Sequence, residues 1–156
     1  MKKVFFTPVG GKFYPLAFTW GAKVQIINDK VLMSNLIELK SNNLDKEAVS
    51  KLPLEQKIEY TSNNLDLCLD LAIILIEQGC AYLNRFEPGR RIREKDARDE
   101  NGIWKPLNKD DLLLSIEDDE ISKLASSIVK CDNSKKGEIS VSYNDPKSKK
   151  KQQVKR

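Results

Sequence analysis

The sequence predicts a mainly helical α+β protein: an N-terminal β-hairpin packed on a bundle of four or five helices, followed by a disordered basic tail. Three observations predict this fold class. Two runs rich in aromatic and branched residues flank Gly10-Gly11 near the amino terminus. Apolar residues then recur at helical spacing, most densely over residues 65–76. The last part of the chain is rich in lysine and poor in apolar side chains.

Length and charge divide the chain into one domain and a tail. Its 156 residues are the size of a single compact domain. Residues 134–156 hold eight of the 27 Lys and Arg and two of the 23 Asp and Glu, which leaves a net charge of −2 on residues 1–133. We therefore expect one helical domain over 1–133, with a charged excursion at 87–107, and a flexible lysine-rich tail at 134–156.

The hairpin prediction rests on residues 3–18. Gly10-Gly11 tolerates the positive φ angles that both central positions of a tight hairpin turn require. Pro8 and Pro15 cannot donate to a strand ladder, so both strands are expected at sheet edges. Because an isolated two-stranded ribbon is marginally stable, this hairpin must lie on helices or pair with another strand.

Two short helices and a helical turn are predicted next. Thr19 can cap a helix that runs to about Asn28, and a second helix is expected at 31–40, before a short turn at 45–51. The residues predicted to face inward are Ala22, Val24, Ile26 and Ile27 in the first helix, and Leu32, Leu36 and Leu39 in the second.

A long central helix is predicted from Pro53 to about Phe86. Its apolar side chains are expected to form the core of the domain. The inward set is Leu54, Ile58, Leu65, Cys68, Leu69, Ala72, Leu75 and Ile76. Asp66, Asp70 and Glu77 form a polar stripe that we interpret as facing solvent, rather than as a metal or acid–base site, because no second helix has acidic residues at matching spacing.

The charged excursion at 87–107 allows two interpretations. Its arginines could bind a phosphate or a protein partner. Acidic and basic side chains nearly balance, however, so we favour a solvated loop whose Trp104 packs back onto the body.

The remaining residues before the tail are predicted to be helical. Asn108 with Asp111, and Ser115 with Asp118, look like helix starts, and the acidic residues 118–120 suit the first turn of a helix. An apolar face is expected at Ile116, Ile121, Leu124, Ile128 and Val129, up to Cys131. Residues 138–143 alternate like a strand.

Composition excludes several kinds of chemistry. The chain has no histidine, which excludes Ser-His-Asp and Cys-His nucleophile systems and His-ligated zinc. Its three cysteines form no CxxC pair and are interpreted as reduced thiols in apolar surroundings. No glycine-rich phosphate loop or other catalytic motif is present. We therefore predict no catalytic, cofactor-binding or metal-binding residues, and a binding or assembly protein rather than an enzyme.

The predicted location is the cytoplasm. Met1-Lys2-Lys3 is followed by no long apolar leader, and the most apolar run, at 65–76, contains Asp66 and Asp70. That run is also shorter than the ~20 residues needed to cross a bilayer. No membrane partner is expected.

The opening Gly11-Lys12-Phe13-Tyr14-Pro15-Leu16-Ala17-Phe18-Thr19 resembles the amino-terminal segment of tail assembly chaperones of long-tailed bacteriophages and prophages. The long apolar helix, the Asn101-Gly102-Ile103-Trp104 turn and the lysine-rich end are also similar to that family. The resemblance implies a non-enzymatic protein that binds the tape-measure protein and recruits tail tube subunits in the host cytoplasm. It also implies a second, longer form made by ribosomal frameshifting, for which an A-rich run encoding Lys149–Lys151 could supply the slippage site.

An alternative is a small nucleic-acid-associated or regulatory adaptor that acts through the basic tail and the arginine-rich loop. The nearly neutral body disfavours nucleic acid as a partner. Association of the chain with a second copy of itself is a further interaction that we consider. The candidate partner-binding residues are aromatic side chains of residues 13–20 and of the Asn101–Trp104 turn, together with arginines of the charged excursion. They are Phe13, Tyr14, Phe18, Trp20, Arg90, Arg91, Arg93 and Trp104.

Overall fold

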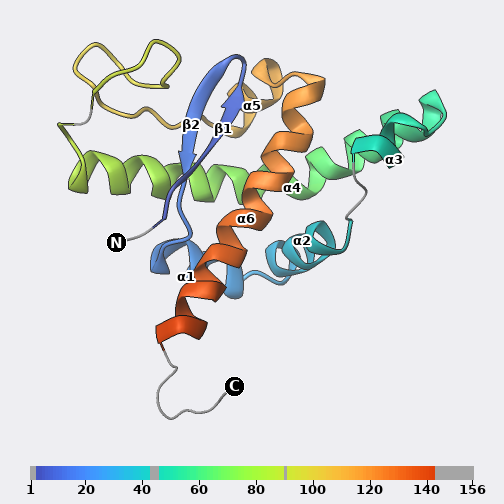
Figure 1. Cartoon of the computed structure of the whole chain (residues 1–156), viewed down its shortest axis with the longest axis horizontal. Helices are drawn as coiled ribbons and strands as arrows, with labels where there is room; N and C mark the ends of the chain where they lie inside the picture. Colours follow the sequence, from blue (N-terminus) through green and yellow to red (C-terminus); the bar gives the residue numbers. More distant parts are fainter. Residues whose placement is uncertain (1–2, 43–45, 90, 143–156) are drawn as a thin grey trace.

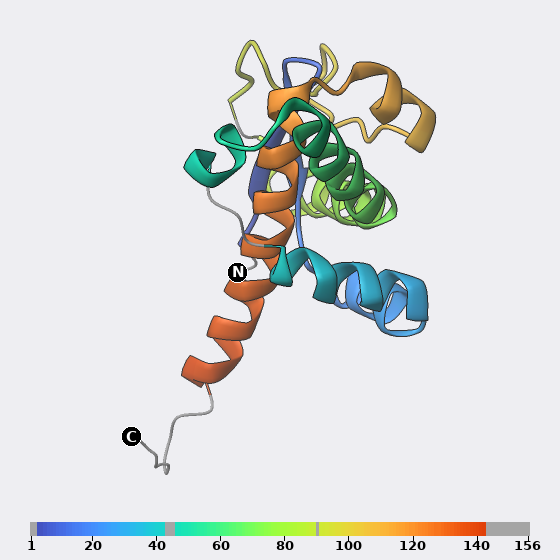
Figure 2. The ribbon, with the colours of Figure 1, turned by 90° about the vertical axis from the view of Figure 1, so that its right-hand side faces the viewer.

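A computed structural model describes residues 3–42, 46–89 and 91–142. Within them the chain forms a two-stranded antiparallel sheet and six α-helices, which confirms the predicted mainly helical α+β fold with an N-terminal hairpin. The elements are β1 (Phe5–Val9), β2 (Lys12–Leu16), α1 (Trp20–Ile27), α2 (Lys30–Ser41), α3 (Lys46–Ser50), α4 (Leu54–Phe86), α5 (Lys109–Ser115) and α6 (Asp118–Ser142). The hairpin and α6 both cross α4 (Figure 1), and α1 and α2 project as a pair beside the lower half of α6 (Figure 2).

The hairpin turn is the one that the Gly-Gly pair predicts. Gly10 and Gly11 have φ angles of 61° and 82°, as a two-residue type I′ turn requires. The register pairs Val9 with Lys12 next to the turn and Phe5 with Leu16 at the far end. Each proline is paired with a phenylalanine, Pro8 with Phe13 and Pro15 with Phe6, at positions whose backbone nitrogen faces away from the partner strand. Neither proline therefore removes a hydrogen bond between the two strands.

The central helix α4 supplies much of the core. Its buried residues recur at helical spacing from Asn64 to Leu83, and Leu71, Leu75 and Ile76 are fully buried. Leu54 and Ile58, which were predicted to face inward, are 73% and 61% exposed. That prediction is wrong because the first turns of α4 extend with α3 past the hairpin and α6 (Figure 1), and no element in the described part of the chain covers these two side chains.

The end of β2 lies directly against α4. The backbone N–H of Ala17 donates to the carbonyl oxygen of Leu75 at 3.2 Å. A Cβ atom added to Gly79 would lie 2.4 Å from the carbonyl oxygen of Pro15. The glycine is therefore required by the close approach of the two backbones, which a side chain would prevent.

The two short helices start at side-chain caps. The Thr19 hydroxyl accepts from the N–H of Ala22, as predicted, and Asp29 accepts from the first N–H groups of α2. The predicted α2 core residues Leu32, Leu36 and Leu39 are buried. In α1 only Ala22 and Ile26 are buried. Val24 and Ile27 are exposed, contrary to the prediction, because the neighbouring helices α2 and α4 cover one side of α1 only.

Helix α5 begins as predicted, whereas helix α6 differs from its prediction at both ends. Asn108 caps α5 as expected, through the N–H of Asp111. Helix α6 begins at Asp118, where the Glu120 carboxylate accepts from the N–H of Glu117 at 2.9 Å, so one half of a capping box is formed at Glu117 instead of Ser115. Residues 138–142 are helical and not a strand, since a helix satisfies its own backbone whereas a strand needs a partner. Tyr143 and the rest of the predicted tail lie outside the described residues.

The predicted apolar face of α6 is confirmed. Ile121, Leu124, Ile128 and Cys131 are buried, while Ile116 and Val129 are partly buried against the same core. Burial raises the pKa of the Cys131 thiol to about 12, so the thiol is protonated at neutral pH.

Candidate partner-binding surface

The charged excursion folds back onto the hairpin. The N–H of Phe13 donates to the carbonyl oxygen of Lys95 at 2.8 Å, and the N–H of Ala97 donates to the carbonyl oxygen of Phe13 at 3.0 Å. These bonds satisfy the open edge of β2, and Ala97 is 5% exposed. The prediction of a solvated loop fits residues 91–95, which are exposed, but it is wrong for Asp96 and Ala97, which are buried. We call residues 91–107 the returning segment.

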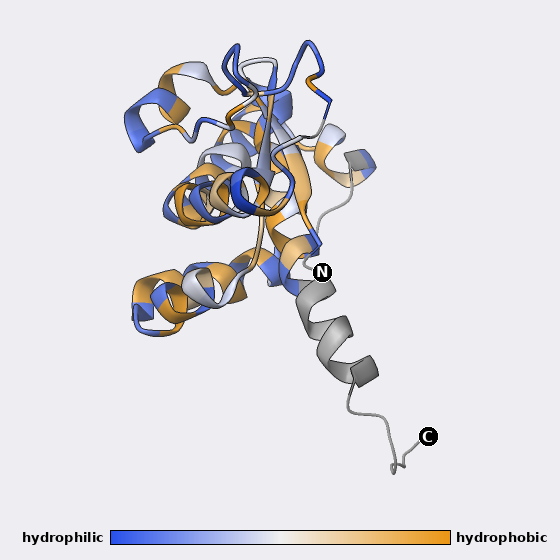
Figure 3. Cartoon of the chain, turned by 90° about the vertical axis from the view of Figure 1, so that its left-hand side faces the viewer, coloured by the Kyte–Doolittle hydropathy of each residue, from blue (hydrophilic) through white to orange (hydrophobic). Residues whose placement is uncertain are grey.

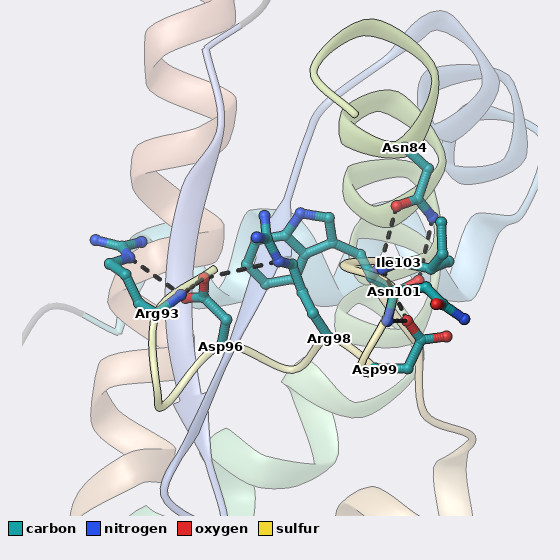
Figure 4. A network of polar contacts seen from close by, with 8 residues as sticks. Asn84, Arg93, Asp96, Arg98, Asp99, Asn101 and Ile103 are labelled. Atoms are coloured by element: carbon teal, nitrogen blue, oxygen red, sulfur yellow. Dashed lines mark hydrogen bonds and ion pairs between the residues drawn. The ribbon is translucent and has the colours of Figure 1, made fainter. Parts of the chain in front are cut away.

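A buried carboxylate organises the charges of the returning segment (Figure 4). Asp96 is 5% exposed, and its oxygens lie 3.5 Å from Nε of Arg93 and 3.9 Å from Nε of Arg98. The same carboxylate accepts from the backbone N–H of Arg93 at 3.1 Å. The Arg98 guanidinium lies over the Trp104 ring, with its Cζ atom 5.1 Å from the ring centroid. The arginines thus neutralise an acid within the fold, which reduces the charge available to a phosphate or partner.

Trp104 is held by α4 and by its own turn. Both polar groups of the Asn84 side chain pair with its backbone, accepting from the N–H at 2.9 Å and donating to the carbonyl oxygen at 3.1 Å. The centroid of the Trp104 ring lies 5.7 Å from the centroid of the Phe6 ring. In the preceding turn, the Asp99 carboxylate accepts from the N–H of Ile103, and this bond lowers the pKa of Asp99. The prediction that Trp104 packs onto the body is confirmed.

The predicted partner-binding residues do not form one patch. Phe18 and Trp104 are 7% and 2% exposed and belong to the core, so neither side chain is presented to a partner. Tyr14 is partly buried, and burial raises its pKa. Exposed side chains are found at Phe13, Trp20, Arg91 and Arg93, the last of which contacts Asp96. Arg90 lies outside the described residues. Trp20 is on α1, whereas the other exposed candidates belong to the hairpin and the returning segment.

The main exposed apolar surface on the short helices lies on α1 and the start of α2. Trp20, Val24 and Ile27 follow one another at helical spacing and are 62%, 52% and 55% exposed. Val31, in the first turn of α2, is 64% exposed. These four residues define the α1 face, and the α1–α2 pair shows extensive hydrophobic colouring in Figure 3. The buried residues Ala22 and Ile26 occupy the opposite side of the same helix.

The sequence contains a signal for the α1 face that the prediction did not use. An eight-residue helix that borders its core on one side buries one set of apolar residues. Helix α1 has two sets, Ala22 with Ile26 and Trp20 with Val24 and Ile27, which lie on opposite sides. One of the two sets had to remain exposed.

Comparison of the chain with protein-family models, with curated proteins and with solved structures finds no significant match. None of the helices in the described part of the chain combines the length and apolar character needed to span a bilayer. Over residues 3–42, 46–89 and 91–142, no three Cys, Asp or Glu side chains gather as a metal site would require.

Proposed function

We propose that this chain is a non-enzymatic tail assembly chaperone of a long-tailed phage or prophage, which binds the tape-measure protein and recruits tail tube subunits. The single observation that carries the proposal is the α1 face, on which four large apolar side chains are more than half exposed. Contiguous exposed apolar side chains are typical of protein–protein contact surfaces. The resemblance of the hairpin segment to that family supplies the identity of the partner.

The α1 face suits a helical partner. Its side chains recur at the spacing with which an apolar stripe on one helix packs against another. A single contact of this size is weak. A long rod offers many such sites, and contact between neighbouring bound copies would raise the effective concentration for each further contact.

The proposal is tested by co-expressing the chain with the tape-measure protein encoded in the same genome and measuring how much of that protein stays soluble. Val24→Ser with Ile27→Ser should abolish the protection. The matched control is Leu54→Ser with Ile58→Ser, which removes two exposed apolar side chains from α4 and should leave protection intact.

The response to salt separates the proposal from the nucleic-acid alternative. Apolar helix contacts should survive a change from about 50 to 200 mM salt, whereas nucleic-acid binding through several lysines should weaken by orders of magnitude. Equal protection by both double variants, or a genome without a tape-measure protein, contradicts the proposal.

A further inference from the structure

A groove is lined by residues of the hairpin, the end of α2, the first part of α4 and α6. It has a volume of about 1150 Å³. Its walls are formed by Pro8 and Phe13 of the hairpin, Leu39 at the end of α2, Asn64 of α4, and Ser126 and Val129 of α6. We call it the α6 groove. It does not include the residues of the α1 face.

The charge of the α6 groove is positive. Lys123 and Lys130 lie two turns apart on α6, and Lys95 is contributed by the returning segment. Lys123 contacts Asp119 at 3.9 Å and Lys40 pairs with Asp132. Lys95 and Lys130 contact no carboxylate among the side chains that are described, which end at Asp132. The acid of the lining, Glu120, already accepts from the N–H groups of Gly10 and Gly11 at 2.8 and 3.0 Å. Glu120 contributes one negative charge to a lining that contains four lysines, so the lining keeps a positive balance.

A buried amide in the groove lacks a hydrogen-bond partner. Asn64 is 5% exposed, and no donor in the described part of the chain reaches its side-chain oxygen. Nearby, the Tyr60 hydroxyl donates to the carbonyl oxygen of Asn42 at 3.4 Å, so this end of the groove contains polar groups of α2 and α4. A side-chain amide carries a donor and an acceptor side by side, as a peptide group does. The Asn64 oxygen is closed off from solvent, so pairing with the main chain of a peptide requires this side chain to rotate toward the groove.

We propose that the α6 groove binds an acidic peptide segment in extended conformation, with Asn64 pairing to its main chain and Lys95 and Lys130 to its carboxylates. Charge complementarity selects the acidic side chains. The apolar walls at Pro8, Leu39 and Val129 fit a peptide better than a nucleic-acid backbone. The inference does not depend on the proposed function, because the groove and the α1 face use different residues.

The test measures the fluorescence anisotropy of a fluorescein-labelled peptide of alternating Glu and Leu, titrated with the full chain at about 50 mM salt. Lys95→Glu with Lys130→Glu should weaken binding at least about tenfold. Lys3→Glu with Lys30→Glu, at two exposed lysines outside the groove, is the matched charge control and should change the affinity less than about twofold. Because the tail is also basic, a third variant with Lys149, Lys150 and Lys151 changed to Gln should retain the groove-dependent binding.

A substitution of Asn64 separates binding from folding. Asn64→Leu removes a buried acceptor that has no partner, so the thermal midpoint should stay constant or rise while peptide affinity falls about tenfold. The proposal is overturned if the peptide does not bind, or if only the tail variant loses binding. It is also overturned if Asn64→Leu lowers the thermal midpoint without changing affinity, or if a single-stranded oligonucleotide binds more tightly than the peptide and shows the same sensitivity to the two lysine changes.

Discussion

The hairpin is packed on two sides by different kinds of interaction. On the helical side, α4 and α6 cover it with apolar side chains that recur at helical spacing, and Leu75, Leu124 and Ile128 are fully buried. On the other side, the returning segment holds it through backbone hydrogen bonds to Phe13 and a carboxylate shared by two arginines. Burial in this molecule therefore does not follow from hydrophobicity alone. Within a mostly exposed charged segment, the Asp96 carboxylate and the Arg98 side chain are buried beside each other, where the segment meets the edge of β2.

The largest expected effect is on the helical side. Leu75→Ala removes a fully buried side chain from the centre of α4 and should lower the free energy of unfolding by about 2–5 kcal/mol. Ile58→Ala, in the exposed first part of the same helix, should cost less than about 0.5 kcal/mol. Urea denaturation of both variants measures the difference. Equal losses would mean that the first turns of α4 are as well packed as its centre.

The contact between β2 and α4 gives the next largest effect. Gly79→Ala places a methyl group 2.4 Å from the carbonyl oxygen of Pro15, and both backbones must shift to relieve the clash. We expect a loss of about 3 kcal/mol, although alanine favours helix formation by about 1 kcal/mol over glycine. Gly89→Ala is a suitable control, because the added Cβ meets no atom within 4 Å. Unchanged stability of Gly79→Ala in urea would show that the two elements can separate freely.

Sequence reasoning succeeded on the helical side because its signals are local. Gly10-Gly11 predicts the turn, Thr19 and Asn108 predict helix starts, and the spacing of Leu32, Leu36 and Leu39 predicts a buried face. Local spacing does not tell where a neighbouring element ends. For that reason the apolar residues at the start of α4 and on one side of α1 were wrongly assigned to the core.

The returning segment could not be predicted in the same way. Charged composition indicates exposure, and nothing in residues 91–99 reads as a strand that could pair with β2. Burial of Asp96 depends on Arg93 and Arg98 lying next to it in space, and on the edge of β2 being unpaired. The α6 groove was also missed, because it combines residues from elements that are distant in the chain.

A smaller loss is expected from the returning segment. Asp96→Ala removes the acceptor for the Arg93 N–H and the counter-charge of the buried Arg98 side chain, and should cost about 2 kcal/mol. Asp96→Asn keeps an oxygen acceptor and should cost less. Unfolding in urea and proteolysis within residues 91–107 report the two effects. A cost as large as that of Leu75→Ala would mean that the polar side of the hairpin is as important to stability as the apolar side.

The smallest expected effects concern the pH dependence of stability, to which α6 and the returning segment contribute through different carboxylates. Burial raises the pKa of Glu120, but the N–H donors of Glu117, Gly11 and Gly10 outweigh it and hold that pKa below its usual value of 4.5. A carboxyl group with a lowered pKa stabilises the fold above its unfolded pKa, and this contribution is lost as the pH falls through the folded pKa. Glu120→Gln should therefore cost about 1–2 kcal/mol at pH 7 and progressively less below about pH 4.5.

Asp99 is the matched group in the returning segment, because hydrogen bonds also lower its pKa. Asp99→Asn should remove part of the same acid dependence while leaving the packing of α6 on the turn unchanged. Urea titrations of the two variants and of the double variant, at a series of pH values between 7 and the acid range, separate the contributions. If the two sides act independently, the acid-dependent losses add within about 0.5 kcal/mol. A clear excess or deficit would show that the returning segment and α6 stabilise the hairpin as one unit.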